Sequence, residues 1–180
     1  MRILLTNDDG VHAPGLALLE RIARQLSDDV WVCAPAIEQS GTGHSLTLHL
    51  PVRLQEHGEK RFAVAGTPTD ALNLALRKLF TDKKPDLVIS GINHGENLGD
   101  DVTYSGTISA AMEGALAGIP AIALSQALRS GGHGFAAAEA WGEKVLRPLL
   151  DLPIAKRTVI NVNFPARAAE EVRGVRVVRQ

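Results

Sequence analysis

Short apolar segments alternate with longer amphipathic segments along the chain. The apolar segments span about five residues and are bounded by Gly, Pro or Asn, which is typical of buried strands. The longer segments repeat apolar residues with a helical period, as Leu16, Leu19 and Ala23 do. Strands are predicted at residues 2–6, 30–34, 87–91, 121–125 and 159–163, and helices at residues 15–26, 68–80, 107–117 and 135–150.

This alternation predicts an α/β fold with a mostly parallel sheet and helices on both of its faces. Two helix boundaries carry clear signals, because Thr67 and Pro68 favour a helix start and Gly118 favours a helix end. Residues 45–65 break the alternation and predict a small antiparallel excursion from the sheet. Residues 175–179 are rich in valine and predict a last strand.

The bulk properties of the chain predict one soluble domain. A length of 180 residues is enough for a substantial core, and a formal net charge of −1 gives no general electrostatic footprint for a nucleic acid polymer or an anionic membrane. The single cysteine, Cys33, cannot form an internal disulfide. No signal peptide is recognisable, and no apolar run approaches the roughly 20 residues that span a bilayer. We therefore expect a cytoplasmic protein.

Polar residues follow the predicted strands in four segments. They are residues 7–10, 35–44, 90–101 and 104–107, and each supplies glycines and small oxygen-bearing side chains. The carboxyl ends of parallel strands meet at one edge of an open α/β sheet, where ligands bind. We therefore expect the four segments to form one site.

Two adjacent aspartates are the most informative feature of these segments. Asp8 and Asp9 repel each other, and a divalent cation such as Mg²⁺ or Mn²⁺ would hold them together, because hard cations take oxygen ligands. The Ser40 hydroxyl and the Asn93 amide oxygen are neutral ligands that would add coordination without charge. Adjacent strand side chains point to opposite faces, so both aspartates reach one ion only after the chain has left strand geometry, which Gly10 favours.

The start of the third predicted helix has the features of a phosphate site. Backbone N–H groups at a helix start are unpaired, and the helix dipole is positive there. Ser105 and Thr107 add hydroxyls, and Gly106 lets a phosphate approach the backbone closely. The chain has no Walker motif and no dinucleotide fingerprint, which excludes a standard nucleoside triphosphate or NAD module.

Each of these residues also has a simpler structural explanation. Asp-Asp-Gly at a strand end forms turns, Asn93 and Asn97 are typical turn residues, and Ser105 or Thr107 alone is typical of a helix cap. It is the coincidence of four polar loops on one predicted edge that favours a site. A structural role and a substrate contact remain equally open for the three histidines of these segments, His12, His44 and His94.

Four motifs closely resemble the SurE family, the stationary-phase survival proteins, which are metal-dependent nucleotidases. The motifs lie at residues 4–15, 66–70, 90–101 and 104–107, and the resemblance runs over almost the whole chain. It implies a Rossmann-like three-layer α/β sandwich, a single domain over residues 1–180, and one divalent metal ion per subunit. It also implies hydrolysis of nucleoside 5′- and 3′-monophosphates and, in some members, of short polyphosphate.

The resemblance assigns roles to individual residues. The metal ligands of the family map onto Asp8, Asp9, Ser40 and Asn93. Its phosphate contacts map onto Asn97, Ser105, Gly106 and Thr107. Family members form dimers and tetramers, so the resemblance implies a homodimer or homotetramer. The C-terminal arm that the family uses in these contacts is where this sequence departs from it. The family often has an Arg or Lys in the loop beside Ser40, where this chain has Ile-Glu-Gln.

Two classes of function remain open at this point. In a phosphomonoesterase, Asp8 or Asp9 would accept the proton of an attacking water, and the sequence does not choose between them. In a covalent variant of this mechanism Asp8 would be the nucleophile, but phosphatases of that kind usually present Asp-x-Asp and a nearby lysine. The alternative class is a non-catalytic protein that binds a nucleotide or phosphate and has retained the metal pocket.

Overall fold

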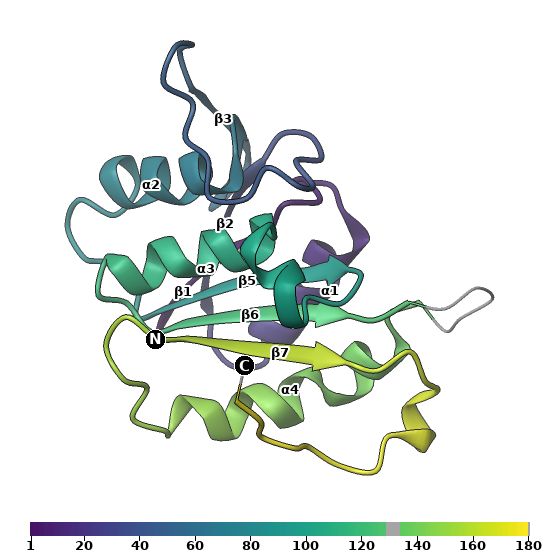
Figure 1. Cartoon of the computed structure of the whole chain (residues 1–180). Coiled ribbons are helices and arrows are strands. Elements are labelled where there is room, and N and C mark those ends of the chain that lie inside the picture. Colours follow the sequence, from purple (N-terminus) through teal and green to yellow (C-terminus); the bar gives the residue numbers. More distant parts are fainter. Residues whose placement is uncertain (129–133, 180) are drawn as a thin grey trace.

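The computed structural model describes residues 1–128 and 134–179. Within these residues the centre of the molecule is a seven-stranded sheet with the order β3-β4-β2-β1-β5-β6-β7 (Figure 1). Neighbouring strands run parallel except for the antiparallel pair β3 and β4. The strands are β1 (Arg2–Thr6), β2 (Asp29–Pro35), β3 (Arg53–Gly58), β4 (Arg61–Ala65), β5 (Leu87–His94), β6 (Ala121–Gln126) and β7 (Val159–Phe164).

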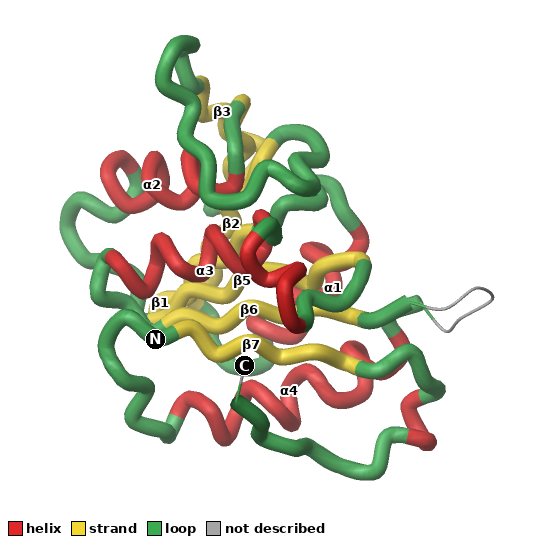
Figure 2. Tube along the Cα trace, in the orientation of Figure 1, coloured by secondary structure: helices red, strands yellow, loops and turns green. Residues whose placement is uncertain are grey.

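Helices cover both faces of the sheet and make the predicted three layers (Figure 2). Ile3 and Leu5 of β1 pack into the core beneath α1 and α4, whereas Leu4 packs into the core beneath α2 and α3. None of the helices in the described part of the chain combines the length and the apolar character that a bilayer span requires. The helices are α1 (Pro14–Ala23), α2 (Pro68–Lys78), α3 (Gly106–Leu116), α4 (Ala136–Leu150) and the short 3₁₀ turns η1 (Gly99–Thr103) and η2 (Ala169–Glu171).

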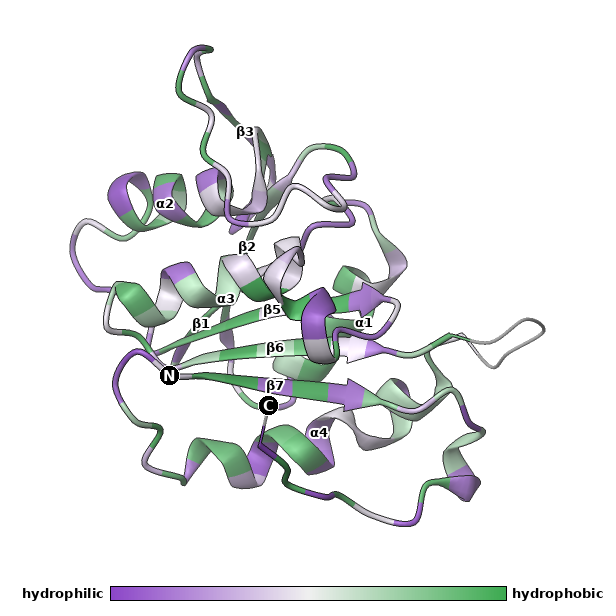
Figure 3. Cartoon of the chain, viewed as in Figure 1, coloured by the Kyte–Doolittle hydropathy of each residue, from purple (hydrophilic) through white to green (hydrophobic). Residues whose placement is uncertain are grey.

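The five strands predicted for the main sheet and the four predicted helices are confirmed, with shifted ends. Figure 3 shows why the central strands were recognisable: β1, β5 and β6 are largely apolar, since helices cover them on both faces. Strand β5 runs three residues past its predicted end, to His94, because its pairing with β6 resumes at Asn93 after a register shift. The predicted start of α2 is also confirmed, since Thr67 and Asp70 form a reciprocal capping box.

Two predicted strand segments are wrong. The antiparallel excursion is confined to β3 and β4, and residues 45–51 form a loop instead. That loop hydrogen bonds to the start of α2, because Thr47 donates from its backbone and its hydroxyl to Asp70. Residues 175–179 are not a strand either. Val175 and Val177 are exposed, and a strand needs a hydrogen-bonding neighbour that a valine-rich sequence alone does not supply.

Candidate active site

Asp8 lies at the carboxyl end of β1, where the chain leaves strand geometry. Its side chain is only 4% exposed, and Thr107 donates its hydroxyl proton to Asp8 Oδ1. The first turn of α3 approaches so closely that a Cβ atom on Gly106 would lie 2.7 Å from the Cβ of Asp8. Glycine is therefore required at position 106, which brings the helix start and the aspartate into direct contact.

Burial raises the pKa of both aspartates. The pKa of Asp8 rises to about 6, because burial disfavours the charged form and the nearby charge of Asp9 adds to this, although the hydrogen bond from Thr107 opposes it. The pKa of Asp9 is raised by burial and by the charge of Glu38, against a backbone hydrogen bond from His94. A bound cation would relieve the cost of keeping both groups charged.

The loop after β2 is tied to the backbone beside Asp8. The N–H of Gln39 donates to the carbonyl oxygen of Asp8 at 2.8 Å. Ser40 follows and is exposed, and its hydroxyl donates to Glu38 Oε1 at 2.9 Å rather than to either aspartate. The structure therefore brings the Ser40 loop to the site, with the hydroxyl proton directed to Glu38 and the oxygen lone pairs left to bind a cation.

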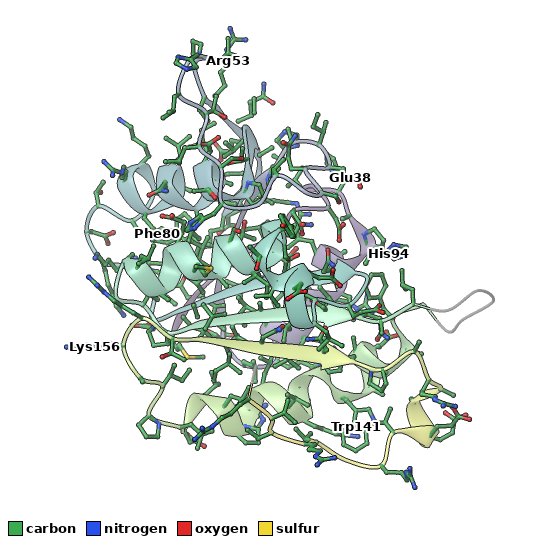
Figure 4. The ribbon with its side chains drawn as sticks, in the orientation of Figure 1. Glu38, Arg53, Phe80, His94, Trp141 and Lys156 are labelled. Atoms are coloured by element: carbon green, nitrogen blue, oxygen red, sulfur yellow. The ribbon has the colours of Figure 1, made fainter. Side chains whose placement is uncertain are left out.

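The end of β5 borders Asp9. His94 N–H donates to Asp9 Oδ2 at 3.1 Å, and the preceding residue, Asn93, donates its amide N–H to the carbonyl of Gly95 at 2.9 Å. Since the amide nitrogen of Asn93 is used in this bond, its Oδ1 is the atom that could bind a cation. Figure 4 shows His94 and Glu38 toward the same end of the molecule, away from Phe80 and Lys156.

The start of α3 has the structure expected of a phosphate site, with one change of role. Ser105 is the N-cap and its hydroxyl oxygen accepts from the N–H of Ile108 at 3.2 Å, which leaves the hydroxyl proton for a ligand. The Thr107 hydroxyl is fully buried and already donates to Asp8. Thr107 therefore orients the aspartate through its hydroxyl, and its backbone N–H also stabilises the charged Asp8 carboxylate.

Asn97 lies farther along the sheet edge, in an asparagine network that the sequence analysis missed. Its amide N–H donates to Ser125 Oγ at 2.8 Å, and its backbone N–H donates to Asn163 Oδ1 at 2.8 Å. Asn161 and Asn163 both donate to the carbonyl oxygen of Asn97. Asn161 and Asn163 lie two residues apart and therefore on the same face of β7, where apolar residues are expected. This pair of polar residues is the feature of the sequence that could have predicted the network.

The donors at this edge suit a hard divalent cation. Asp8, Asp9, Ser40 and Asn93 all offer oxygen, the ligand atom that Mg²⁺ and Mn²⁺ prefer. No group of three or more His, Cys, Asp and Glu side chains within residues 1–128 and 134–179 is arranged to hold a metal ion. A cation here would therefore depend on the neutral Ser40 and Asn93 oxygens as well as on the two aspartates.

Fold and site together define a class: open, mostly parallel α/β proteins that bind an anionic ligand at the carboxyl edge of the sheet, where a helix begins. The family model described as "Survival protein SurE" matches residues 3–180, and this chain belongs to that family.

Curated relatives and a solved structure agree with this assignment. Proteins named "5'-nucleotidase SurE" from Rhizorhabdus wittichii and Erythrobacter litoralis are 66% identical over 184 residues and 64% identical over 182 residues. Each match spans all of this chain and 72% of the relative. The crystal structure of the SurE protein from Aquifex aeolicus superposes with a TM-score of 0.92 at 41% identity, over all of this chain and 72% of that chain.

Proposed function

We propose that this protein is a metal-dependent 5′-nucleotidase, a phosphomonoesterase that converts nucleoside 5′-monophosphates, and also 3′-monophosphates, to nucleoside and inorganic phosphate. The observation that carries the proposal is the contact between the buried Asp8 and the first turn of α3, because it supports a site in which a carboxylate pair and a helix start act on one phosphate. The family membership and the names of the curated relatives support the same activity.

Four residues would hold one Mg²⁺ or Mn²⁺ ion: Asp8, Asp9, Ser40 and Asn93. When bound, the ion neutralises charge on the phosphate and lowers the pKa of a water molecule. Two hydrogen bonds orient the carboxylates for this task, from Thr107 to Asp8 and from the His94 backbone to Asp9. Each hydrogen bond fixes one carboxylate oxygen, which leaves the other for the cation or for a proton.

The substrate phosphate would lie at the start of α3. The backbone N–H group of Gly106 and the Ser105 hydroxyl bind its oxygens and stabilise charge that develops as the ester bond breaks, and Thr107 keeps Asp8 oriented beside them. Asn97 already donates one amide hydrogen to Ser125, so its second amide hydrogen is the one available to the phosphate. Asp8 or Asp9 takes the proton of the attacking water, and both remain candidates for this role.

A phosphate-release assay tests the proposal directly. AMP, GMP, a 3′-nucleotide and short polyphosphate are incubated with the protein in Mn²⁺, in Mg²⁺ and in EDTA, and free phosphate is measured with malachite green. We expect release from the mononucleotides that requires the metal and stops in EDTA. Equal release in EDTA would contradict the metal site.

The second candidate is a nucleotide-binding protein without turnover. It is favoured by the loop before Ser40, where the family often has an Arg or Lys and where this chain has the acidic Glu38, which contacts Ser40. Binding of AMP in calorimetry, with no phosphate released under any metal condition, would select this candidate. We also propose a homodimer or homotetramer, and size-exclusion chromatography with light scattering tests that assembly.

A further inference from the structure

The loop between β2 and β3 carries Ser40 and is fastened at its beginning. The N–H of Gln39 bonds to the Asp8 carbonyl at 2.8 Å, and the backbone of Ile37 and Glu38 packs on Gly10, where a Cβ atom would lie 3.2 Å from Ile37. This first anchor sets where the loop leaves the site. It does not set where the chain goes after Gln39.

A second anchor holds the far side of the loop on the start of α2. Thr47 donates to Asp70 from its backbone, at 3.1 Å, and from its hydroxyl, at 2.6 Å. The Thr67 hydroxyl donates to the carbonyl of Ser45 at 2.8 Å. Figure 2 shows this long loop lying near the beginning of α2, as these contacts require.

Glu113 of α3 makes a third anchor between the other two. Its Oε1 lies 2.6 Å from His44 Nε2, and its Oε2 accepts from the Asn73 amide at 2.9 Å. Asn73 belongs to α2, so one carboxylate joins the loop to both helices. The Glu113 side chain is 17% exposed, and partners on both oxygens compensate for its partial loss of water.

The segment between the first and third anchors forms one short turn, in which the hydroxyl and the backbone N–H of Thr42 donate to the Gln39 carbonyl at 2.8 Å and 3.3 Å. It contains Gly41 at φ +74° and Gly43 at φ +55°, in conformations that favour glycine. These bonds are local to the turn, so its position against α2 and α3 depends on the contacts at its two ends. Ser40 lies in this segment, one residue after the first anchor.

We propose that Glu113 is a positioning residue, which fixes the loop between β2 and β3 against α2 and α3 and thereby holds the Ser40 oxygen beside Asp8 and Asp9. This inference rests on the proposed metal site. Glu113 acts through Ser40 and does not bind the cation, because both of its oxygens are engaged by His44 and Asn73.

Calorimetric titration of Mn²⁺ into the chelator-treated protein tests this role without relying on turnover. Glu113→Ala is expected to weaken Mn²⁺ binding about tenfold, the lower end of the range for partners that orient metal ligands. Glu113→Gln should restore most of the affinity, since an amide can still bond to His44 and Asn73. His44→Ala removes the loop side of the same contact and should behave like Glu113→Ala.

A Ser40→Ala background makes the test specific. If Glu113 acts through Ser40, Glu113→Ala should cause little further loss of Mn²⁺ affinity there. Glu143→Ala is the matched control, because Glu143 also accepts a short ion-pair contact, from Arg147 at 2.5 Å, but lies on α4. The control variant should bind Mn²⁺ as the wild type does.

The outcomes separate this inference from the proposed function. Wild-type affinity in both Glu113→Ala and His44→Ala, or an equal loss with and without Ser40, overturns the positioning role while the nucleotidase proposal stands. A wild-type protein that binds no Mn²⁺ and releases no phosphate overturns both.

Discussion

Two aspartates at opposite ends of neighbouring strands have opposite environments. Asp29 at the start of β2 is surrounded by donors: Lys60 Nζ at 2.9 Å, Arg2 Nε at 3.0 Å and Trp31 Nε1 at 2.8 Å. The Lys60 and Arg2 contacts hold its pKa well below the usual range. Asp8 at the end of β1 is more deeply buried, its hydrogen bond comes from the neutral Thr107, and its pKa is raised.

The contrast distinguishes Asp29, whose carboxylate stabilises the fold, from Asp8, whose carboxylate we propose binds a ligand. Asp29 has its positive partners built into the fold, so its charge stabilises the native state. Asp8 has another carboxylate for a neighbour, and the buried Asn7 Oδ1, Thr6 Oγ1 and Ser90 Oγ nearby have no hydrogen-bond partner among the described residues. Unpaired buried polar atoms are costly unless a site uses them, so they agree with the proposed cation and phosphate site at this end of the sheet.

The largest effect that distinguishes the two ends is on activity. Asp8→Ala and Asp9→Ala should each lower kcat/KM for AMP by about 10³-fold or more, because each removes charge at the site of phosphate transfer. Asp29→Ala should leave kcat/KM within about twofold, since a surface ion pair far from the chemistry contributes only stability. Steady-state kinetics in Mn²⁺ gives the comparison. Full turnover by Asp9→Ala would contradict its assignment as a ligand.

The next effect is on the stability of the metal-free protein, and its sign is opposite at the two ends. Because the folded-state pKa of Asp8 is raised to about 6, its ionised form destabilises the native state at neutral pH. Asp8→Asn should therefore raise the free energy of unfolding in EDTA at pH 7 by about 3 kcal/mol, since the shift is from 3.8 to about 6 and one pKa unit is worth about 1.4 kcal/mol. The gain should shrink as the pH falls through 6 and vanish near pH 4. Urea unfolding measures it, and a loss of stability at pH 7 would contradict the raised pKa.

A smaller effect of the other sign is expected at Asp29. Its folded-state pKa is lowered, so its charge stabilises the protein above the unfolded-state pKa near 4, and this stability is lost as the pH falls. Asp29→Asn should lower the free energy of unfolding at pH 7 by about 1 kcal/mol, a modest value because the side chain is 35% exposed. The same urea series checks it, and an unchanged midpoint at pH 7 would show that the contacts with Lys60 and Arg2 contribute nothing.

The smallest expected effect concerns Cys33, which lies in the middle of β2, away from both aspartates. Cys33 is fully buried, it donates to the Ala71 carbonyl at 3.3 Å, and burial raises the pKa of its thiol to about 12. Almost no thiolate is present at pH 8, so a disulfide reagent should not label the native protein, whereas it should label one thiol per chain in urea. Rapid native labelling would show that β2 is exposed by opening of the sheet.

The main sheet could be predicted because its central strands are buried on both faces and so form continuous apolar runs. The location of the candidate site at the carboxyl edge of the sheet could also be predicted, because parallel strands place Asp8, Asn93 and the start of α3 at the same edge. The strand predicted over residues 45–51 failed because Thr47 pairs with Asp70 rather than with another strand. A local pattern cannot reveal a partner that lies 23 residues away in the sequence.

The finer roles in the site were also beyond the sequence. Thr107 lies at the helix start as predicted, but its hydroxyl donates to Asp8. The two residues are 99 positions apart in the sequence, and their contact depends on how closely α3 approaches β1. The bridge from Glu113 to His44 and Asn73 likewise joins three elements whose distances the sequence does not set. Such contacts depend on how helices, strands and loops pack against one another, which a sequence motif does not specify.

The double use of Asp70 has a consequence for how the molecule assembles. The same carboxylate accepts from Thr67 to begin α2 and from Thr47 to hold the loop that carries Ser40. The loop can settle only after the first turn of the helix has formed. During refolding, the far-ultraviolet circular dichroism signal should therefore recover first, and competence to capture manganese should arrive later.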